Sequence, residues 1–223
     1  MAINNQMLME FAKLLLDALE LTAAITGLYY WKNLQNTVWR WFAIFLVFNF
    51  LSEMVGKYLY NTIALKHYNS LWYRYINIPV TFLFYQWLLK EPLKNYKLIP
   101  NFFMLLYVIV FLLEEFFLSS QYRKFGTLSY QAGTLAILVL SVIFFVNLMK
   151  SDAILEFKTN IRFWVSAGLL LYFIVTMPFN AMRNLIFKQY YSLGIAYWYV
   201  TMFFNCTMYT FFTLGFIWGK PKS

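Results

Sequence analysis

Charge is scarce in this 223-residue chain, because Asp, Glu, Lys and Arg together make up 12% of the residues. An average soluble domain carries about 25%. A soluble globular protein would lack the polar surface it needs, and disordered chains and coiled coils require still more charge. The composition therefore excludes these three classes and favours a polytopic membrane protein.

Cysteine and histidine are almost absent, with Cys206 and His67 as the single members of their types. One cysteine excludes an intramolecular disulfide. One histidine excludes a three-histidine zinc hydrolase and a bis-histidine haem site. Residues 195–218 contain no lysine, so a retinal Schiff base on the last helix is excluded as well. We expect no cofactor and no metal site.

Several motifs are missing too. The sequence has no G-x-S-x-G serine-hydrolase motif. It also has no Pro-Gln dipeptide, which weakens a sugar-transporter interpretation. The net charge of +9 is spread over many short segments without a long Lys/Arg run. This distribution is typical of membrane orientation rather than of nucleic-acid binding.

Apolar residues dominate what is present, at 62% of the chain, and aromatic residues alone account for 23%. About 20 mostly apolar residues are enough to cross the hydrocarbon layer as a helix. Seven segments of that size are separated by short connections. We therefore predict an all-α polytopic membrane protein, a single domain over residues 1–223 that bundles seven transmembrane helices at about 7–31, 38–60, 70–90, 98–118, 128–149, 161–182 and 195–218.

Lysine and arginine give a preferred orientation in the membrane. The amino-terminal side of the predicted spans carries six of them outside the spans, and the opposite side carries ten. The side richer in Lys and Arg is normally cytoplasmic. We predict an amino terminus outside and a carboxyl terminus in the cytoplasm.

Polar residues form stripes along several predicted spans. In the first span, Glu10, Lys13, Asp17 and Glu20 fall within an arc of about 80° at helical spacing. The second span places its polar and small residues in an arc of about 100°, namely Asn49, Ser52, Glu53, Gly56, Lys57 and Tyr60.

The third span shows the same pattern with a proline inside it. Its polar face would hold Ser70, Arg74, Asn77, Thr81 and Tyr85. Pro79 removes a backbone donor, so a kink is expected in this helix.

Polar residues inside a membrane usually face a cavity or a partner because their exposure to lipid is costly. With the predicted orientation, most of them converge on the outer half of the bundle. We therefore predict an outward-facing polar cavity that binds a small ligand. Its candidate ligand-binding residues are Asp17, Glu20, Asn49, Glu53, Lys57, Arg74, Asn77, Asn180, Trp198 and Asn205.

Less specific interpretations apply to some of these charges. The i, i+4 pair Glu53 and Lys57 can neutralise itself within its helix. Arg74 can extend to lipid phosphates, while Glu114 and Glu115 have the positions of ordinary helix-end residues in the headgroup layer. Six acidic residues against four basic ones in the predicted outer cluster favour a cationic or zwitterionic ligand.

Three segments resemble a group of small, uncharacterised bacterial seven-helix membrane proteins. They are LELTAAITGLYYWKNLQNT (19–37), FLSEMVGKYL (50–59) and RFWVSAGLLLYF (162–173), with Glu20, Gly27, Glu53, Gly56, Trp164 and Gly168 as the matching positions. Related sequences often carry a carboxylate in the third span where this chain has Thr81. The resemblance implies the same fold in a bacterial cytoplasmic membrane and implies no activity.

Three functions fit these observations. The first is a sensor or receptor that binds a small ligand from outside and signals through a partner protein. The second is a small-solute transporter, coupled to protons through Glu20 or Glu53. The third is an intramembrane enzyme that modifies lipid with paired carboxylates as acid and base. A cavity closed on the cytoplasmic side favours the first function, and a continuous polar path favours the second.

Overall fold

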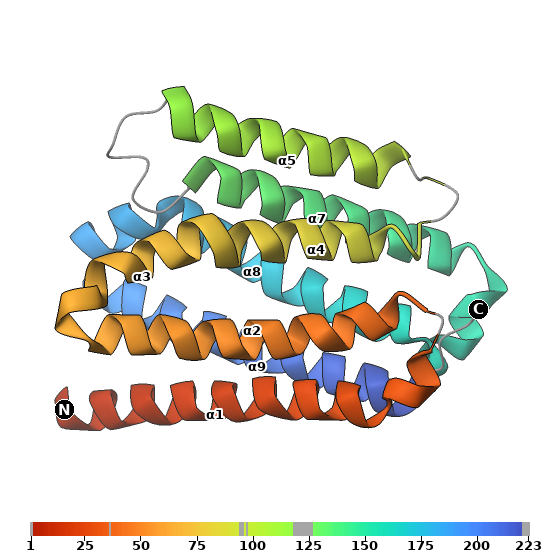
Figure 1. The fold of residues 1–223 in the computed structure, drawn as a ribbon, viewed down its shortest axis with the longest axis horizontal. Coiled ribbons are helices and arrows are strands. Elements are labelled where there is room, and N and C mark those ends of the chain that lie inside the picture. Colours follow the sequence, from red (N-terminus) through yellow and green to blue (C-terminus); the bar gives the residue numbers. More distant parts are fainter. Residues whose placement is uncertain (1, 36, 94–95, 97, 118–126, 220–223) are drawn as a thin grey trace. The chain divides into compact units, whose positions relative to one another are not determined.

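The computed structural model describes residues 2–35, 37–93, 96, 98–117 and 127–219. Regular structure in these ranges is helical throughout, and no β-strand occurs in them. The long helices are α1 (Ala2–Tyr29), α2 (Trp39–Asn61), α5 (Leu98–Phe117), α7 (Thr127–Met149), α8 (Ile161–Gln189) and α9 (Tyr191–Trp218), labelled in Figure 1. The prediction of an all-α protein is confirmed.

The third predicted span is built from three pieces. A short helix α3 (Lys66–Trp72) runs into a π-helical segment η3 (Tyr73–Asn77), and α4 (Ile78–Leu89) follows directly. Pro79 lies at the second position of α4, directly after the π-helical segment. The irregularity expected at Pro79 therefore lies just before it. Short 3-10 helices occupy η1 (Trp31–Leu34), η2 (Ile63–Leu65) and η5 (Asp152–Thr159).

Five of the described helices are long and apolar enough to cross a membrane: α2, α5, α7, α8 and α9. This gives the chain the character of a multi-pass membrane protein. The count of seven spans is not confirmed. The α1 helix matches the first predicted span but carries the charged stripe of Glu10, Lys13, Asp17 and Glu20, and α3 and α4 are each too short to span alone.

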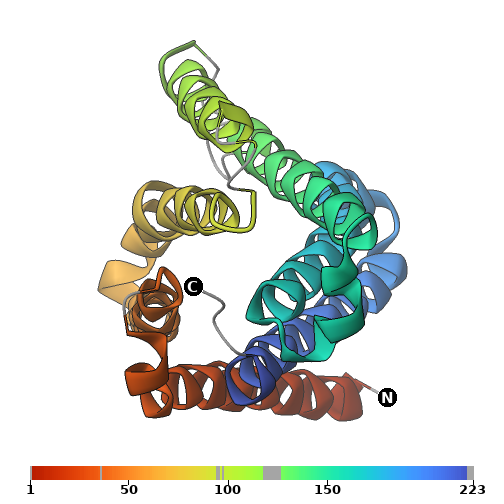
Figure 2. The ribbon, with the colours of Figure 1, turned by 90° about the vertical axis from the view of Figure 1, so that its right-hand side faces the viewer.

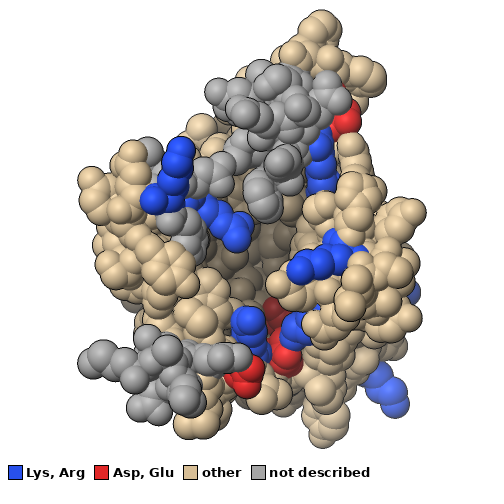
Figure 3. Space-filling view, turned by 90° about the vertical axis from the view of Figure 1, so that its left-hand side faces the viewer, with Lys and Arg blue, Asp and Glu red and all other residues tan. Residues whose placement is uncertain are grey.

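The described surface agrees with an apolar environment. Figure 3 shows that uncharged residues cover most of the described surface on the face it presents, with charged side chains in separate small groups. Large apolar side chains such as Leu105, Ile109 and Phe116 on α5 are exposed. Only 17% of the most apolar stretch of α5 is buried within the protein. Such a helix face is suited to lipid rather than to water.

The chain divides into two compact units. Unit 1 comprises residues 1–47 and 156–223, and unit 2 comprises residues 48–155. One boundary falls inside α2, between Val47 and Phe48, and the other inside η5, between Leu155 and Glu156. The two units are described separately below, and the single-domain prediction stays a prediction.

Unit 1 is organised around the antiparallel pair α8 and α9, with α1 packed against α9. Glycine allows the close approach of the pair, because a Cβ on Gly168 would lie 3.2 Å from the backbone oxygen of Met208. The ring of Phe42 packs edge-on against Phe212 at 5.0 Å and stacks on Phe216 at 5.5 Å. The core of unit 1 is therefore aromatic and tightly packed.

Unit 2 packs α4 and α5 against α7. The buried ring of Phe82 contacts Tyr107 at 5.6 Å and Tyr130 at 5.1 Å between ring centroids. A Cβ on Gly133 would lie 2.6 Å from the Phe82 ring, so only glycine admits that ring. Figure 2 shows these three helices end-on.

Candidate functional site: the η3 network of unit 2

A group of polar side chains surrounds the π-helical segment in unit 2. We call it the η3 network, and it consists of Ser52 and Glu53 from α2, Trp72 from α3, Tyr73, Arg74, Tyr75 and Asn77 from η3, and Glu115 from α5. Isolated π-helical turns are rare and occur frequently at functional sites. The network joins three parts of unit 2 that are far apart in the sequence, namely α2, the continuous α3–η3 segment and α5.

Ser52 is the centre of the part that faces α2. Its hydroxyl oxygen accepts a hydrogen bond from Trp72 Nε1 at 3.0 Å and another from Asn77 Nδ2 at 2.7 Å. Ser52 and Asn77 are both buried, at 2% and 8% exposure. Two donors from one segment thus converge on a single buried acceptor.

Glu53 is bonded next to this centre. The hydroxyl of Tyr73 donates to Glu53 Oε2 at 2.7 Å. Gly56, one turn further along α2, makes room for the ring, because a Cβ there would lie 2.8 Å from two ring carbons of Tyr73. Glycine at position 56 of the α2 stripe therefore leaves the space that the Tyr73 ring occupies.

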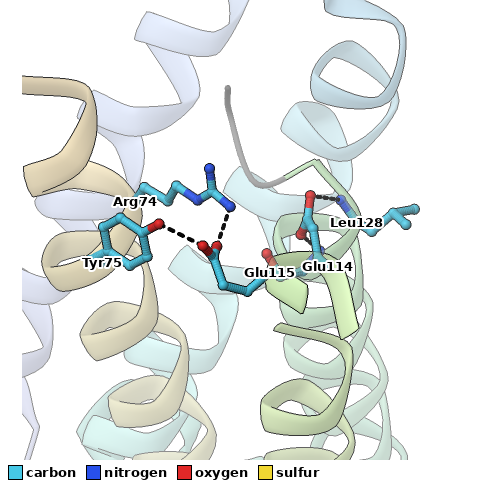
Figure 4. Close-up of polar contacts among 6 residues, drawn as sticks. Arg74, Tyr75, Glu114, Glu115 and Leu128 are labelled. Atoms are coloured by element: carbon cyan, nitrogen blue, oxygen red, sulfur yellow. Dashed lines mark hydrogen bonds and ion pairs between the residues drawn. The ribbon is translucent and has the colours of Figure 1, made fainter. Parts of the chain in front are cut away.

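Glu115 receives the other side of η3, as Figure 4 shows. Arg74 forms an ion pair with Glu115 Oε2, and the hydroxyl of Tyr75 donates to Glu115 Oε1 at 2.8 Å. The side chains of Arg74 and Glu115 are 12% and 25% exposed. The Arg74 guanidinium also lies 5.2 Å from the centre of the Tyr75 ring. Partial burial makes this pair stronger than a fully solvated one.

Glu114 has a different role from its neighbour. It is buried, and its two oxygens accept from the backbone N–H groups of Leu128 at 3.3 Å and Ser129 at 2.8 Å. These N–H groups belong to the first turn of α7, where they lack partners within the helix. Glu114 therefore caps α7, and in Figure 4 it points away from Glu115 towards that helix start.

The predicted site residues of unit 2 fall in or beside this network. Glu53, Arg74 and Asn77 are members of it. Asn49 and Lys57 lie on α2 one turn before and one turn after Glu53, and both are half-buried. The predicted common face of Arg74 and Asn77 is not found, because Arg74 reaches α5 while Asn77 reaches α2.

The other five predicted residues belong to unit 1. Glu20 is buried at 4% exposure, and Asn205 on α9 is half-buried. Asp17 is half-buried one turn earlier on α1. Asn180 and Trp198 are half-buried, and each follows in the sequence one of the two rings, Phe179 and Tyr197, that stack at 5.0 Å between α8 and α9. The prediction that all ten residues line one cavity stays a prediction.

The aromatic members of the network were missed from the sequence. Trp72, Tyr73 and Tyr75 look like interface aromatics in a chain that is 23% aromatic. The headgroup interpretation of Glu114 and Glu115 also misses their bonds to α7 and η3. The one available signal was Pro79, which marked the helix as irregular without giving its partners.

Among the residues that the structure describes, no three His, Cys, Asp or Glu side chains come together as metal ligands would.

Comparison with known protein families, with curated protein sequences and with solved structures finds no match to this chain.

Proposed function

We propose that this chain is a membrane-embedded sensor or receptor that binds a small cationic or zwitterionic ligand at the η3 end of unit 2. The observation that carries the proposal is the η3 network itself. Three of the residues predicted to bind ligand, Glu53, Arg74 and Asn77, are held there by hydrogen bonds from different helices. Fixed donors and acceptors of this kind are what a small polar ligand requires.

Charge supports the class of ligand. Glu53, Glu114 and Glu115 lie in or beside the network, with Lys57 and Arg74 as the cations. Carboxylates thus exceed cations by one among these five residues. A cationic or zwitterionic group is favoured near such an arrangement, since opposite charges attract most strongly where water is partly excluded.

A receptor also requires a response to binding. The η3 segment contacts α2 on one side and α5 on the other, so a ligand that alters its bonds to one helix changes its contacts to the other. A partner protein in the membrane would read that change, and the outward orientation predicted for this end would give the ligand access from outside the cell.

Thermal unfolding of the purified protein in lipid nanodiscs tests the proposal. Choline, glycine betaine and arginine serve as probes, and glucose serves as the neutral comparison. A ligand at about 100 times its dissociation constant stabilises the protein by about 2.7 kcal/mol. We expect at least one charged probe to raise the midpoint, and we expect Glu53→Gln to abolish that rise.

Glu10→Gln is the matched control, because it makes the same chemical change at an exposed position of α1. It should leave the ligand-dependent rise unchanged. The proposal fails if no charged probe raises the midpoint, or if the rise persists in Glu53→Gln.

Transport is the second candidate, and one observation favours it. Gln86 on α4 is fully buried, and neither of its amide atoms has a hydrogen-bond partner among the described residues. Thr134 and Ser141 on α7 are also fully buried, and their hydroxyl oxygens likewise have no hydrogen-bond partner among the described residues. An unpaired buried amide costs roughly 2–7 kcal/mol. Polar groups retained at that cost suit a path for a polar solute.

Uptake of radiolabelled choline into proteoliposomes distinguishes the two candidates. For a transporter, Gln86→Leu should abolish uptake while the protein becomes more stable. For a receptor, choline should not accumulate in vesicles with either protein.

A further inference from the structure

The two donors that meet at Ser52 are five residues apart. In an α-helix, residues 72 and 77 would point about 140° away from each other, since each residue turns by about 100°. A π turn closes its hydrogen bond at the fifth residue and winds less per residue, so two such residues point in more similar directions than they would on an α-helix. The Ile78 N–H bonds to the Tyr73 carbonyl with this spacing. The π geometry is thus what allows Trp72 and Asn77 to share Ser52.

The contacts of η3 with α5 also depend on the π geometry. Arg74 and Tyr75 are consecutive, yet both reach the carboxylate of Glu115. Consecutive residues on an α-helix diverge by about 100° and do not normally meet one partner. A π turn winds less per residue, which brings the two side chains closer in direction.

Pro79 weakens the alternative helical register. In a regular α-helix, its ring would clash with the carbonyl of Tyr75 four residues earlier, and its missing N–H would leave that carbonyl unbonded. The wider π turn reduces this clash, but a π turn is itself a rare conformation. Both registers therefore carry a defect, and side-chain contacts decide between them.

We infer that η3 is a register switch that couples α2 to α5. In the π register, Ser52 holds Trp72 and Asn77 while Glu115 holds Arg74 and Tyr75. In the α register, Trp72 and Asn77 diverge, and the segment before Asn77 turns relative to α4. The bonds to α2 and the bonds to α5 are then lost together. This inference concerns the protein without ligand and stands whether or not the proposed function is correct.

Distances between pairs of spin labels test the switch directly. Cys206 is the single cysteine, so Cys206→Ser provides a background without thiols. Labels at Tyr68→Cys on α3 and Val80→Cys on α4 flank η3, and both positions are exposed. A second pair, Tyr68→Cys and Leu112→Cys, reports on α5 through another exposed position. Pulsed electron paramagnetic resonance in nanodiscs gives the distance distributions.

The switch is biased by changing one residue of the α2 side at a time. Ser52→Ala removes the shared acceptor, and Tyr73→Phe removes one hydroxyl with almost no change in shape. We expect both variants to populate one and the same second distance for each label pair, absent or minor in the parent. Thr210→Ala, which removes a hydroxyl that bonds within its own helix in unit 1, should leave the parent distribution unchanged.

Two results would overturn the inference. One is a parent-like distribution in both variants for the pair that flanks η3. The other is a broad distance distribution that differs between the two variants. Such a distribution would indicate local unfolding of the segment, whereas a switch gives one defined second distance. Tyr73→Phe is mild enough to keep the comparison valid if Ser52→Ala does not fold.

Discussion

The α8–α9 pair of unit 1 and the η3 end of unit 2 both hold helices in close contact, with opposite chemistry. In unit 1, Gly168 lets the helix backbones approach, and rings such as Phe179 and Tyr197 stack between them. In unit 2, α2 is joined to η3 by hydrogen bonds to Ser52 and Glu53, and α5 is joined to η3 through Glu115.

The difference has a physical consequence. Close packing of small and aromatic residues has many weak contacts, and each depends on shape alone. A polar network has few contacts, each of which needs a specific partner in a specific direction. Packing therefore suits a fixed scaffold, and the η3 network suits an element with two discrete arrangements.

The largest effect is expected from filling the glycine contact of unit 1. Gly168→Leu places a side chain where the Met208 carbonyl and Phe211 already lie within 3.3 Å of a bare Cβ. We expect a loss of about 3 kcal/mol, at the upper end of overpacking costs. Reversible unfolding in mixed detergent micelles measures it. Val142→Leu, at an exposed position of α7, should stay within about 0.5 kcal/mol of the parent.

The next effect separates shared from local hydrogen bonds. Ser52→Ala leaves both Trp72 and Asn77 without their acceptor, and we expect a loss of about 2 kcal/mol. Thr201→Ala is the comparison, because Thr201 Oγ1 donates only to carbonyls of its own helix, at 2.7 and 2.9 Å. It should cost less than about 0.5 kcal/mol. If the two variants lose the same unfolding free energy in these micelles, the shared bonds to Ser52 contribute no more than a local bond, and the prediction is wrong.

The two adjacent glutamates should behave differently. Glu114→Gln weakens the cap on α7, which we expect to cost about 1 kcal/mol locally. Amide hydrogen exchange at Leu128 and Ser129 should then accelerate about fivefold. Glu115→Gln should leave those two amides at the parent rate, since its bonds go to η3. Acceleration in both variants would mean that the assignment of separate roles is wrong.

The smallest effect is expected at the rim of the network. Tyr75→Phe removes one hydrogen bond to Glu115 from a residue that is 44% exposed. We expect a loss of about 0.5 kcal/mol, the low end for such bonds. Tyr58→Phe, at a more exposed position on α2, should have no measurable effect in the same unfolding experiment. A larger loss for Tyr58→Phe would contradict the placement of the network.

Helices were predictable from the sequence to a useful degree. The predicted ranges 38–60, 98–118 and 128–149 match α2, α5 and α7 within one residue at each end. Long apolar runs make such helices hard to miss. The count of seven spans stays a prediction, because the third predicted span is divided among α3, η3 and α4 and the first carries a charged stripe.

Part of the network was also predictable. Glu53, Arg74 and Asn77 stood out because charged and amide groups are costly in lipid. The way they pair was not predictable, since the argument for shared faces assumes about 100° per residue and fails across a π turn. The position of Tyr73 was unpredictable for a second reason. Its ring packs against Gly56, which lies 17 positions earlier and has no polar side chain to mark it.

A double-mutant cycle between Ser52→Ala and Glu115→Gln tests most directly whether the two sides of η3 act as one unit. The unfolding free energies of the parent, both single variants and the double variant would be measured in the same micelles. If losing Ser52 already releases Arg74 and Tyr75, the double variant should lose about 1 kcal/mol less than the sum of the single losses. Losses that add to within about 0.3 kcal/mol would show two independent contacts and contradict the coupling of α2 to α5.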